Sequence, residues 1–304
     1  MQSRPPYRLG MSTPIQRPGI VVCVDGSPAS MVAVDWATRD AVMRSVPLTL
    51  VHVASGLAGS WPQTPIPTGF GEWQRRRGHE IFDDAVRIVE QAVPGPGLIQ
   101  VETEMYYSAT IPTLVDISKD AEMVVVGSRG HSAIGSLLGS VSAGLVQHAH
   151  CPVAVIHDED PLMPYPAHAP VLVGIDGSPT SELATAIAFD EASRRHVDLI
   201  ALHAWGDARL VDFPGMDWPT MKSSEDEVLA ERLAGRQERY PDVQVHRHVV
   251  CDRPARQLIE RSEAAQLVVV GSHGRGGFAG MLLGSVSSAV VQSARMPVIV
   301  ARQP

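Results

Sequence analysis

The chain has 304 residues, of which 44% are hydrophobic and 19% are charged, and its formal net charge is −8. This length favours two domains of about 150 residues, each with its own core. The negative charge argues against a nucleic-acid partner, whose binding would depend on neutralising phosphates. No apolar run reaches the roughly 18 residues that predict a membrane span, so we expect no membrane partner.

Residues 1–18 have no pattern of a secretory signal and are interpreted as a flexible N-terminal extension, which makes the cytoplasm the expected location. The three cysteines, Cys23, Cys151 and Cys251, are too scattered for a disulfide framework or a CxxC metal site. They are typical of buried, unreactive thiols in a reducing compartment.

The predicted elements alternate between β-branched runs and helical patterns. The expected strands lie at 20–24, 48–53, 98–104, 123–127 and 153–157, and then at 171–175, 197–204, 243–249, 267–271 and 297–301. Helical patterns lie between them, for example at 29–44, 72–93 and 112–119. Continuous apolar runs such as MVVVG indicate strands that helices cover on both faces. Each half is therefore predicted to be an α/β domain with a five-stranded, doubly wound parallel sheet.

The two halves are repeats of one another, because the same segments occur in the same order. The paired segments are IVVCVDGSP at 20–28 with VLVGIDGSP at 171–179, VVVGS at 124–128 and 268–272, and LLGSVS at 137–142 and 282–287. The acidic, proline-rich stretch 158–169 is interpreted as a linker. We therefore predict one domain over 19–157 and a second over 170–304.

Ligands of such sheets bind beyond the carboxyl ends of the strands, where the strand order reverses. Asp25 and Asp176 follow the first strand of each half, and Gly127 and Gly271 end each fourth strand. Two loops in each half are thus expected to meet at one ligand site.

A glycine-rich loop leads from Gly271 to a helix that is predicted to start near Ser285. Glycines let the backbone approach a ligand closely, and a helix start offers unpaired N–H groups to phosphate. The hydroxyls of Ser285 and Ser287 are further candidate donors. An acidic protein can bind a polyanion by these means.

With these motifs the chain resembles the universal stress proteins of the tandem type, from Gly19 to Arg302. ATP-binding members of that family carry G-x2-G-x9-G-[S/T] after an aspartate that ends the first strand. The second half matches this pattern at Asp176, Gly271, Gly274, Gly284 and Ser285. The first half aligns at Gly127, Gly130, Gly139 and Ser140, but its loop is one residue shorter, so the first site is the less certain one.

The resemblance implies two tandem Rossmann-like domains of the adenine nucleotide alpha hydrolase-like type that bind ATP, with Mg2+ or Mn2+ on the phosphates and no dedicated metal cage. The aspartate would lie near the ribose or the metal, Gly127 or Gly271 near the ribose, and Val53 or Ala204 near adenine. The candidates of the first half are Asp25, Val53, Gly127, Gly130, Gly139, Ser140, Val141 and Ser142. Those of the second half are Asp176, Ala204, Gly271, Gly274, Arg275, Gly284, Ser285, Val286 and Ser287.

Several other interpretations compete with this one. The DGSP segments also fit a turn with a serine N-cap, and the glycines also fit close helix–strand packing. The G-x-G-x-x-A pattern at 274–279 follows a fourth strand rather than a first, which argues against NAD. His148, His150 and Cys151 suit a helix end better than a metal site, and His52 and His203 suit packed positions better than catalytic ones.

No catalytic constellation recurs in both halves, so we predict a nucleotide-dependent stress-response regulator without catalytic residues. A slow ATPase and a nucleotide-free interaction module are the alternatives. The duplication and the resemblance imply a pseudo-dimer of the two halves through their terminal strands. A homodimer of whole chains and a protein partner that the sequence does not name are compatible with this.

Overall fold

A computed structural model of the chain divides it into two compact units, one up to Cys151 and the other from Pro152 to Gln303. The residues that the structure describes are 19–54, 68–93, 95, 99–130, 138–157, 168–205, 218–275 and 282–302. The predicted N-terminal extension and most of the predicted linker lie outside these ranges.

The first unit is a parallel sheet of the order β3-β2-β1-β4. Its elements are β1 (Ile20–Cys23), α1 (Pro28–Arg44), β2 (Leu48–Val53), α2 (Phe70–Ala92), β3 (Val101–Tyr106), α3 (Thr110–Ile117), β4 (Met123–Gly127) and α4 (Ser140–His148). The order reverses between β1 and β4, which is where a doubly wound sheet opens a crevice for a ligand.

The second unit repeats this order as β10-β9-β6-β7-β8, again with parallel pairing. Its elements are β5 (Val153–Ile156), β6 (Val171–Gly174), α5 (Pro179–Arg195), β7 (Leu199–Ala204), α6 (Trp218–Arg239), β8 (Val245–Val250), α7 (Pro254–Ser262), β9 (Leu267–Gly271), α8 (Ser285–Ser293) and β10 (Val298–Ala301). Its crevice therefore lies between β6 and β9.

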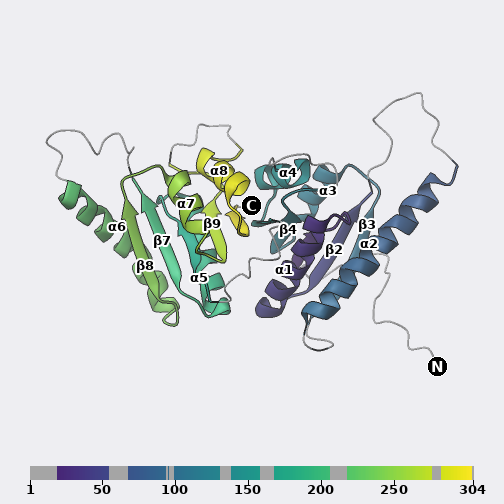
Figure 1. Cartoon of the computed structure of the whole chain (residues 1–304), viewed down its shortest axis with the longest axis horizontal. Coiled ribbons are helices and arrows are strands. Elements are labelled where there is room, and N and C mark those ends of the chain that lie inside the picture. Colours follow the sequence, from purple (N-terminus) through teal and green to yellow (C-terminus); the bar gives the residue numbers. More distant parts are fainter. Residues whose placement is uncertain are drawn as a thin grey trace. The chain divides into compact units, whose positions relative to one another are not determined.

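Helices cover both faces of each sheet, as Figure 1 shows for each unit. In the first unit α1 packs against α2, and α3 packs against α4 on the other face. In the second unit α5 packs on β6 and β9, whereas α7 packs against α8. Strands β4 and β9 are buried almost throughout, as their continuous apolar sequences require. None of the described helices is long and apolar enough to cross a membrane.

The DGSP segments do form turns with N-caps. Ser27 and Ser178 cap α1 and α5 by accepting a hydrogen bond from the backbone N–H three residues later, and a proline opens each helix. Gly26 and Gly177 adopt φ angles of +82° and +78°, a left-handed conformation that glycine tolerates best. The aspartate at the start of each segment is thereby fixed at the end of a strand.

The α/β fold with a mostly parallel sheet is confirmed, and some strand bounds differ from the prediction by a few residues. The strands β3 and β8 start at Val101 and Val245, a few residues later than expected. In addition, β5 groups with the second unit and pairs antiparallel with β10.

Candidate functional site

A cavity of about 530 Å³ opens in the second unit at the carboxyl ends of β6 and β9. Six segments contribute to its wall: the end of β6 with the following loop, the start of α5, the end of β7, the start of α7, the end of β9 with the following loop, and the first turn of α8. The lining residues are Gly174, Ile175, Asp176, Ser181, Leu202, Ala204, Pro254, Leu258, Val270, Gly271, His273, Gly274, Arg275, Gly284, Ser285, Val286 and Ser287. Its volume is in the range typical of small-molecule sites.

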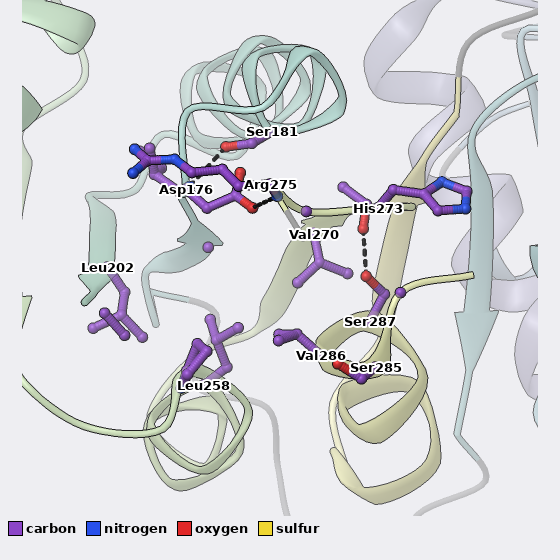
Figure 2. A pocket seen from close by; sticks show the side chains of 17 residues that line it. Asp176, Ser181, Leu202, Leu258, Val270, His273, Arg275, Ser285, Val286 and Ser287 are labelled. Atoms are coloured by element: carbon purple, nitrogen blue, oxygen red, sulfur yellow. Dashed lines mark hydrogen bonds between the residues drawn. The ribbon is translucent and has the colours of Figure 1, made fainter. Parts of the chain in front are cut away.

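The carboxylate of Asp176 connects the two loops at this edge. Its Oδ1 accepts a hydrogen bond of 2.9 Å from the backbone N–H of Ser178. Its Oδ2 accepts one of 3.1 Å from the backbone N–H of Arg275, in the glycine loop. The N–H of Asp176 itself donates to Oγ of Ser181 at 3.0 Å. The aspartate is therefore held in place by its neighbours before any ligand arrives (Figure 2).

Gly271 and Gly274 are glycines because other atoms come too close for a side chain. A Cβ on Gly274 would lie 2.5 Å from Oδ2 of Asp176. A Cβ on Gly271 would lie 2.8 Å from Oγ1 of Thr180 and 2.9 Å from its backbone carbonyl carbon, so this glycine lets α5 pack closely on β9. Both interpretations of the glycines thus apply, since Gly271 packs a helix and also lines the cavity.

The first turn of α8 presents its N–H groups to the cavity. Gly284 is the N-cap and, being a glycine, supplies no side-chain acceptor for the helix N–H groups. The amides of the first turn have no partner within the helix, and they carry the positive end of its dipole. The cavity wall includes all three residues of this turn, Ser285, Val286 and Ser287. This arrangement is suited to an anion.

The two serines of this turn differ in their surroundings. Ser287 is buried, and its hydroxyl donates to the backbone carbonyl of Gly271, which ties α8 to the end of β9. Ser285 is exposed. A free hydroxyl donor was expected at both positions, but at Ser287 the proton is already used within the protein.

The other end of the cavity is apolar. Leu202 and Leu258 line this end. In Figure 2, Val270 lies in the middle of the wall and Val286 lies beside Ser285 at the start of α8. Leu202 and Leu258 come from β7 and α7, and neither was among the predicted site residues. The signal that could have indicated them is topological, because the helix after the third strand of a half must also start at the carboxyl edge of the sheet.

All nine candidate residues of the second half line this one cavity. They come from four segments that are up to 111 positions apart in sequence, from Asp176 to Ser287, and they include Ala204 at the end of β7. Arg275, for which the sequence offered no repeat partner of the same charge, also lies in the wall.

The first unit repeats much of this backbone geometry. A Cβ on Gly130 would lie 2.7 Å from Oδ2 of Asp25, which parallels the Gly274–Asp176 contact. The N–H of Gly139 donates to the carbonyl of Ser128 at 2.8 Å, as Gly284 does to Ser272 at 2.7 Å. The eight-residue loop whose shortening distinguishes this half lies largely outside the described residues.

The remaining candidates of the first unit lie at the corresponding positions. Ser142 donates to the carbonyls of Ser128 and Gly139 at 3.0 and 2.9 Å, so its hydroxyl ties α4 to β4. Ser140 and Val141 open α4, Val53 ends β2, and Gly127 ends β4. A Cβ on Gly127 would lie 2.7 Å from the carbonyl carbon of Ala29, so this glycine also lets a helix pack on its strand.

The two strand-end histidines make the same backbone contact. Nδ1 of His52 lies 2.7 Å from the carbonyl oxygen of Val24, and Nδ1 of His203 lies 2.7 Å from that of Ile175. Each therefore donates a ring proton to the first strand's end and joins the second strand to it. Neither histidine is in the cavity wall. The structure thus supports a packing role for both.

Cation ligands are sparse at the cavity. Asp176 is the one carboxylate among the lining residues. Within the described part of the chain, no three His, Cys, Asp or Glu side chains gather in a way that could hold a metal ion.

Known proteins resemble this chain in sequence and in fold. The model of the universal stress protein family matches residues 18–157 and 168–302. The chain belongs to the universal stress protein family. It is 60% identical over 286 residues to universal stress protein Rv2623 of Mycobacterium tuberculosis (strain H37Rv), which covers 94% of this chain and 96% of that relative.

Other members of the family resemble the chain over similar lengths. Universal stress protein Mb2028c of Mycobacterium bovis is 57% identical over 294 residues, 96% of this chain and all of that one. Among solved structures, a universal stress protein from Archaeoglobus fulgidus superposes with a TM-score of 0.71 at 21% identity, covering 95% of this chain and 100% of that chain. This structural likeness extends over both repeats.

Proposed function

We propose that the second unit binds ATP and that the bound nucleotide regulates the conformation or partner choice of this universal stress protein. The observation that carries the proposal is a single cavity of about 530 Å³ with an uncapped helix start at one end and an apolar wall at the other. A nucleotide has the matching division into an anionic phosphate chain and a flat, largely apolar base.

Each part of the cavity wall suits a different part of the nucleotide. The amides of Ser285, Val286 and Ser287, with the side chain of Arg275, would hold phosphates. The backbone at Gly274 and Gly284 can come close to them because no side chain intervenes. Asp176 and Gly271 would lie near the ribose, and the base would lie beside Ala204 and the leucines.

A divalent cation fits this site only when it is bound to the phosphates of the nucleotide. Mg2+ usually keeps several waters and takes one or two carboxylates together with phosphate oxygens. Asp176 is the carboxylate at hand, and two backbone N–H groups already hold it. We therefore propose that Mg2+ or Mn2+ enters with the triphosphate rather than occupying a preformed cage.

The residues that line the cavity suit a regulatory role better than rapid catalysis. Phosphoryl transfer to water needs a group that positions the attacking water and cations that stabilise the transition state. The lining residues offer Arg275 and His273, but the carboxylate of Asp176 is tied to the loops. A regulator instead requires that ATP favour one of two conformations, since a ligand with equal affinity for both shifts nothing.

The test begins with the protein purified without added nucleotide. Any nucleotide released on denaturation is identified by chromatography and mass spectrometry, and Mg-ATP is titrated into the emptied protein by calorimetry. Adenine nucleotide in the preparation, or saturable ATP binding, supports the proposal. Absence of both would favour a nucleotide-free interaction module. Phosphate release near the usual per-second range of enzymes would favour the hydrolase alternative.

Location and assembly are proposed on separate observations. No disulfide joins the three cysteines, which suits the reducing cytoplasm. The antiparallel pairing of β5 with β10 joins the last strands of the two repeats, and this supports a pseudo-dimer through terminal strands. A homodimer of whole chains and a protein partner remain proposals that size measurement and affinity capture can test.

A further inference from the structure

The two repeats differ at one strand position beside the cavity. Cys23 ends β1 and pairs with Val51 of β2, and Gly174 ends β6 and pairs with Leu202 of β7. Because the register is the same in both units, these two residues occupy equivalent places. The first repeat therefore carries a thiol side chain where the second carries none.

Gly174 marks where such a side chain would lie. It lines the cavity, and a Cβ built on it would lie 3.0 Å from Cδ1 and 3.3 Å from Cδ2 of Leu258 on α7. Leu258 belongs to the apolar end of the cavity. A side chain at this position would thus enter the space between strand and helix where the base is proposed to bind.

The corresponding helix of the first unit has the same environment. Leu114 of α3 is 1% exposed, and Leu258 of α7 is 2% exposed. Four positions further along each helix, Ser118 and Ser262 donate to the carbonyl three residues back. With α3 equivalent to α7, alternation along the strand directs the side chain of Cys23 toward α3.

A second difference between the units also reduces the space at the base end of the first site. Val53 ends β2 where Ala204 ends β7, so the first unit carries two more side-chain carbon atoms at the strand end that borders the base. Two other differences give the first site more space, because Val24 and Val51 are each one methylene smaller than the equivalent Ile175 and Leu202. These two differences shorten side chains that are present in both units. The side chain of Cys23, in contrast, occupies a place that holds no side chain in the second unit.

We propose that Cys23, with Val53, closes the base end of the first unit's site, so that each chain holds one adenine nucleotide, in the second unit. This rests on the proposed function. It also gives the two repeats different roles, because the second responds to nucleotide and the site of the first is filled by its own side chains. Cys23 is half-buried, and its desolvation, together with the nearby Asp25 and Cys151, raises its pKa to about 12, so the thiol is neutral and suits an apolar filling.

The experiment counts bound ATP per chain by calorimetry, with Mg-ATP as the probe, in the full-length wild type and in two reciprocal variants. The variant Cys23→Gly/Val53→Ala opens the first site and should raise the count from one to two. The variant Gly174→Cys fills the second site and should weaken binding there by tenfold or more, because the added side chain takes up space that the base would occupy. Cys23→Ser, which keeps the size of the side chain, should stay at one.

The outcomes distinguish a failure of the proposed function from a failure of the proposed closure of the first site. A wild type that binds no ATP contradicts the proposed function itself. A wild type that binds two contradicts only the closure of the first site. If the opened variant still binds one, the shortened glycine loop rather than Cys23 closes that site, and the proposal fails. Thermal unfolding of every variant checks that it folds, and Cys23→Gly/Val53→Ala remains informative should Gly174→Cys not fold.

Discussion

The backbone N–H of Arg275 donates a hydrogen bond of 3.1 Å to Oδ2 of Asp176, 99 residues earlier in the chain. This bond joins the loop after the first strand of the repeat to the glycine loop after the fourth. The same carboxylate holds the N–H of Ser178 through its other oxygen. The hydroxyls of Ser178 and Thr180 also donate to the carbonyl of His273, so Asp176 shares the task of joining the two loops.

Replacing Asp176 by alanine should weaken both the fold and the site. Two backbone donors would lose their acceptor, and this should lower the free energy of unfolding by about 1–3 kcal/mol. ATP affinity should fall as well, because the glycine loop would lose its anchor. Urea unfolding and calorimetry with Mg-ATP measure the two effects.

Asp25→Ala is the matched control in the first unit, where Asp25 accepts from the N–H of Ser27 at 2.9 Å. It should lower stability by a similar amount but leave ATP binding in the second unit unchanged. Equal loss of ATP binding in both variants would show that Asp176 has no special role at the site.

Replacing Gly274 by alanine should disturb the same contact from the other side. The added methyl group would lie 2.5 Å from Oδ2 of Asp176, too close to fit, so the loop must shift. We expect ATP affinity to fall by tenfold or more, on the order of the cost of overpacking. Calorimetry measures this directly.

Gly235→Ala is the control, because Gly235 lies in α6 and a methyl group added to it would meet no atom within 4 Å. In an exposed helix interior this change should raise stability by about 0.5–1 kcal/mol and leave ATP binding intact. An unaltered affinity in Gly274→Ala would mean that the glycine loop does not shape the site.

The serines that open α8 should separate ligand binding from folding. Ser287→Ala removes the hydroxyl that ties α8 to Gly271 and should cost about 1 kcal/mol of unfolding free energy. Ser285→Ala should leave stability nearly unchanged, because Ser285 is exposed, yet it should weaken ATP binding. Unfolding curves and ATP titrations of both variants test this, and the opposite pattern would contradict the proposed phosphate position.

The thiol of Cys23 should react very slowly in the native protein. A pKa of about 12 lies far above the ordinary value for a thiol, so the reactive thiolate is present only at strongly alkaline pH. At pH 8 alkylation should be roughly a thousandfold slower than that of an unstructured cysteine. Mass spectrometry of the Cys23 peptide after iodoacetamide treatment measures the rate, with urea-unfolded protein as the control. Rapid labelling of folded protein at pH 8 would contradict the raised pKa of this thiol.

The sequence by itself determined the repeats, the order of strands and helices, and the nine second-half residues that line one cavity. These follow from local signals. Continuous apolar runs predict covered strands, and closely spaced glycines before a helix predict a backbone that approaches a ligand. Asp176 and Gly274 were recognisable because such loops must meet where a doubly wound sheet reverses its strand order.

Only the tertiary structure decided which apolar side chains complete the site and which polar groups are already used. Leu202 and Leu258 look like ordinary core residues in sequence, and they reach the cavity because β7 and α7 both meet its edge. The hydroxyl of Ser287 bonds to Gly271, and β5 pairs antiparallel with β10. These contacts join residues that are distant along the chain, and local patterns carry no information on which distant groups will pack or pair.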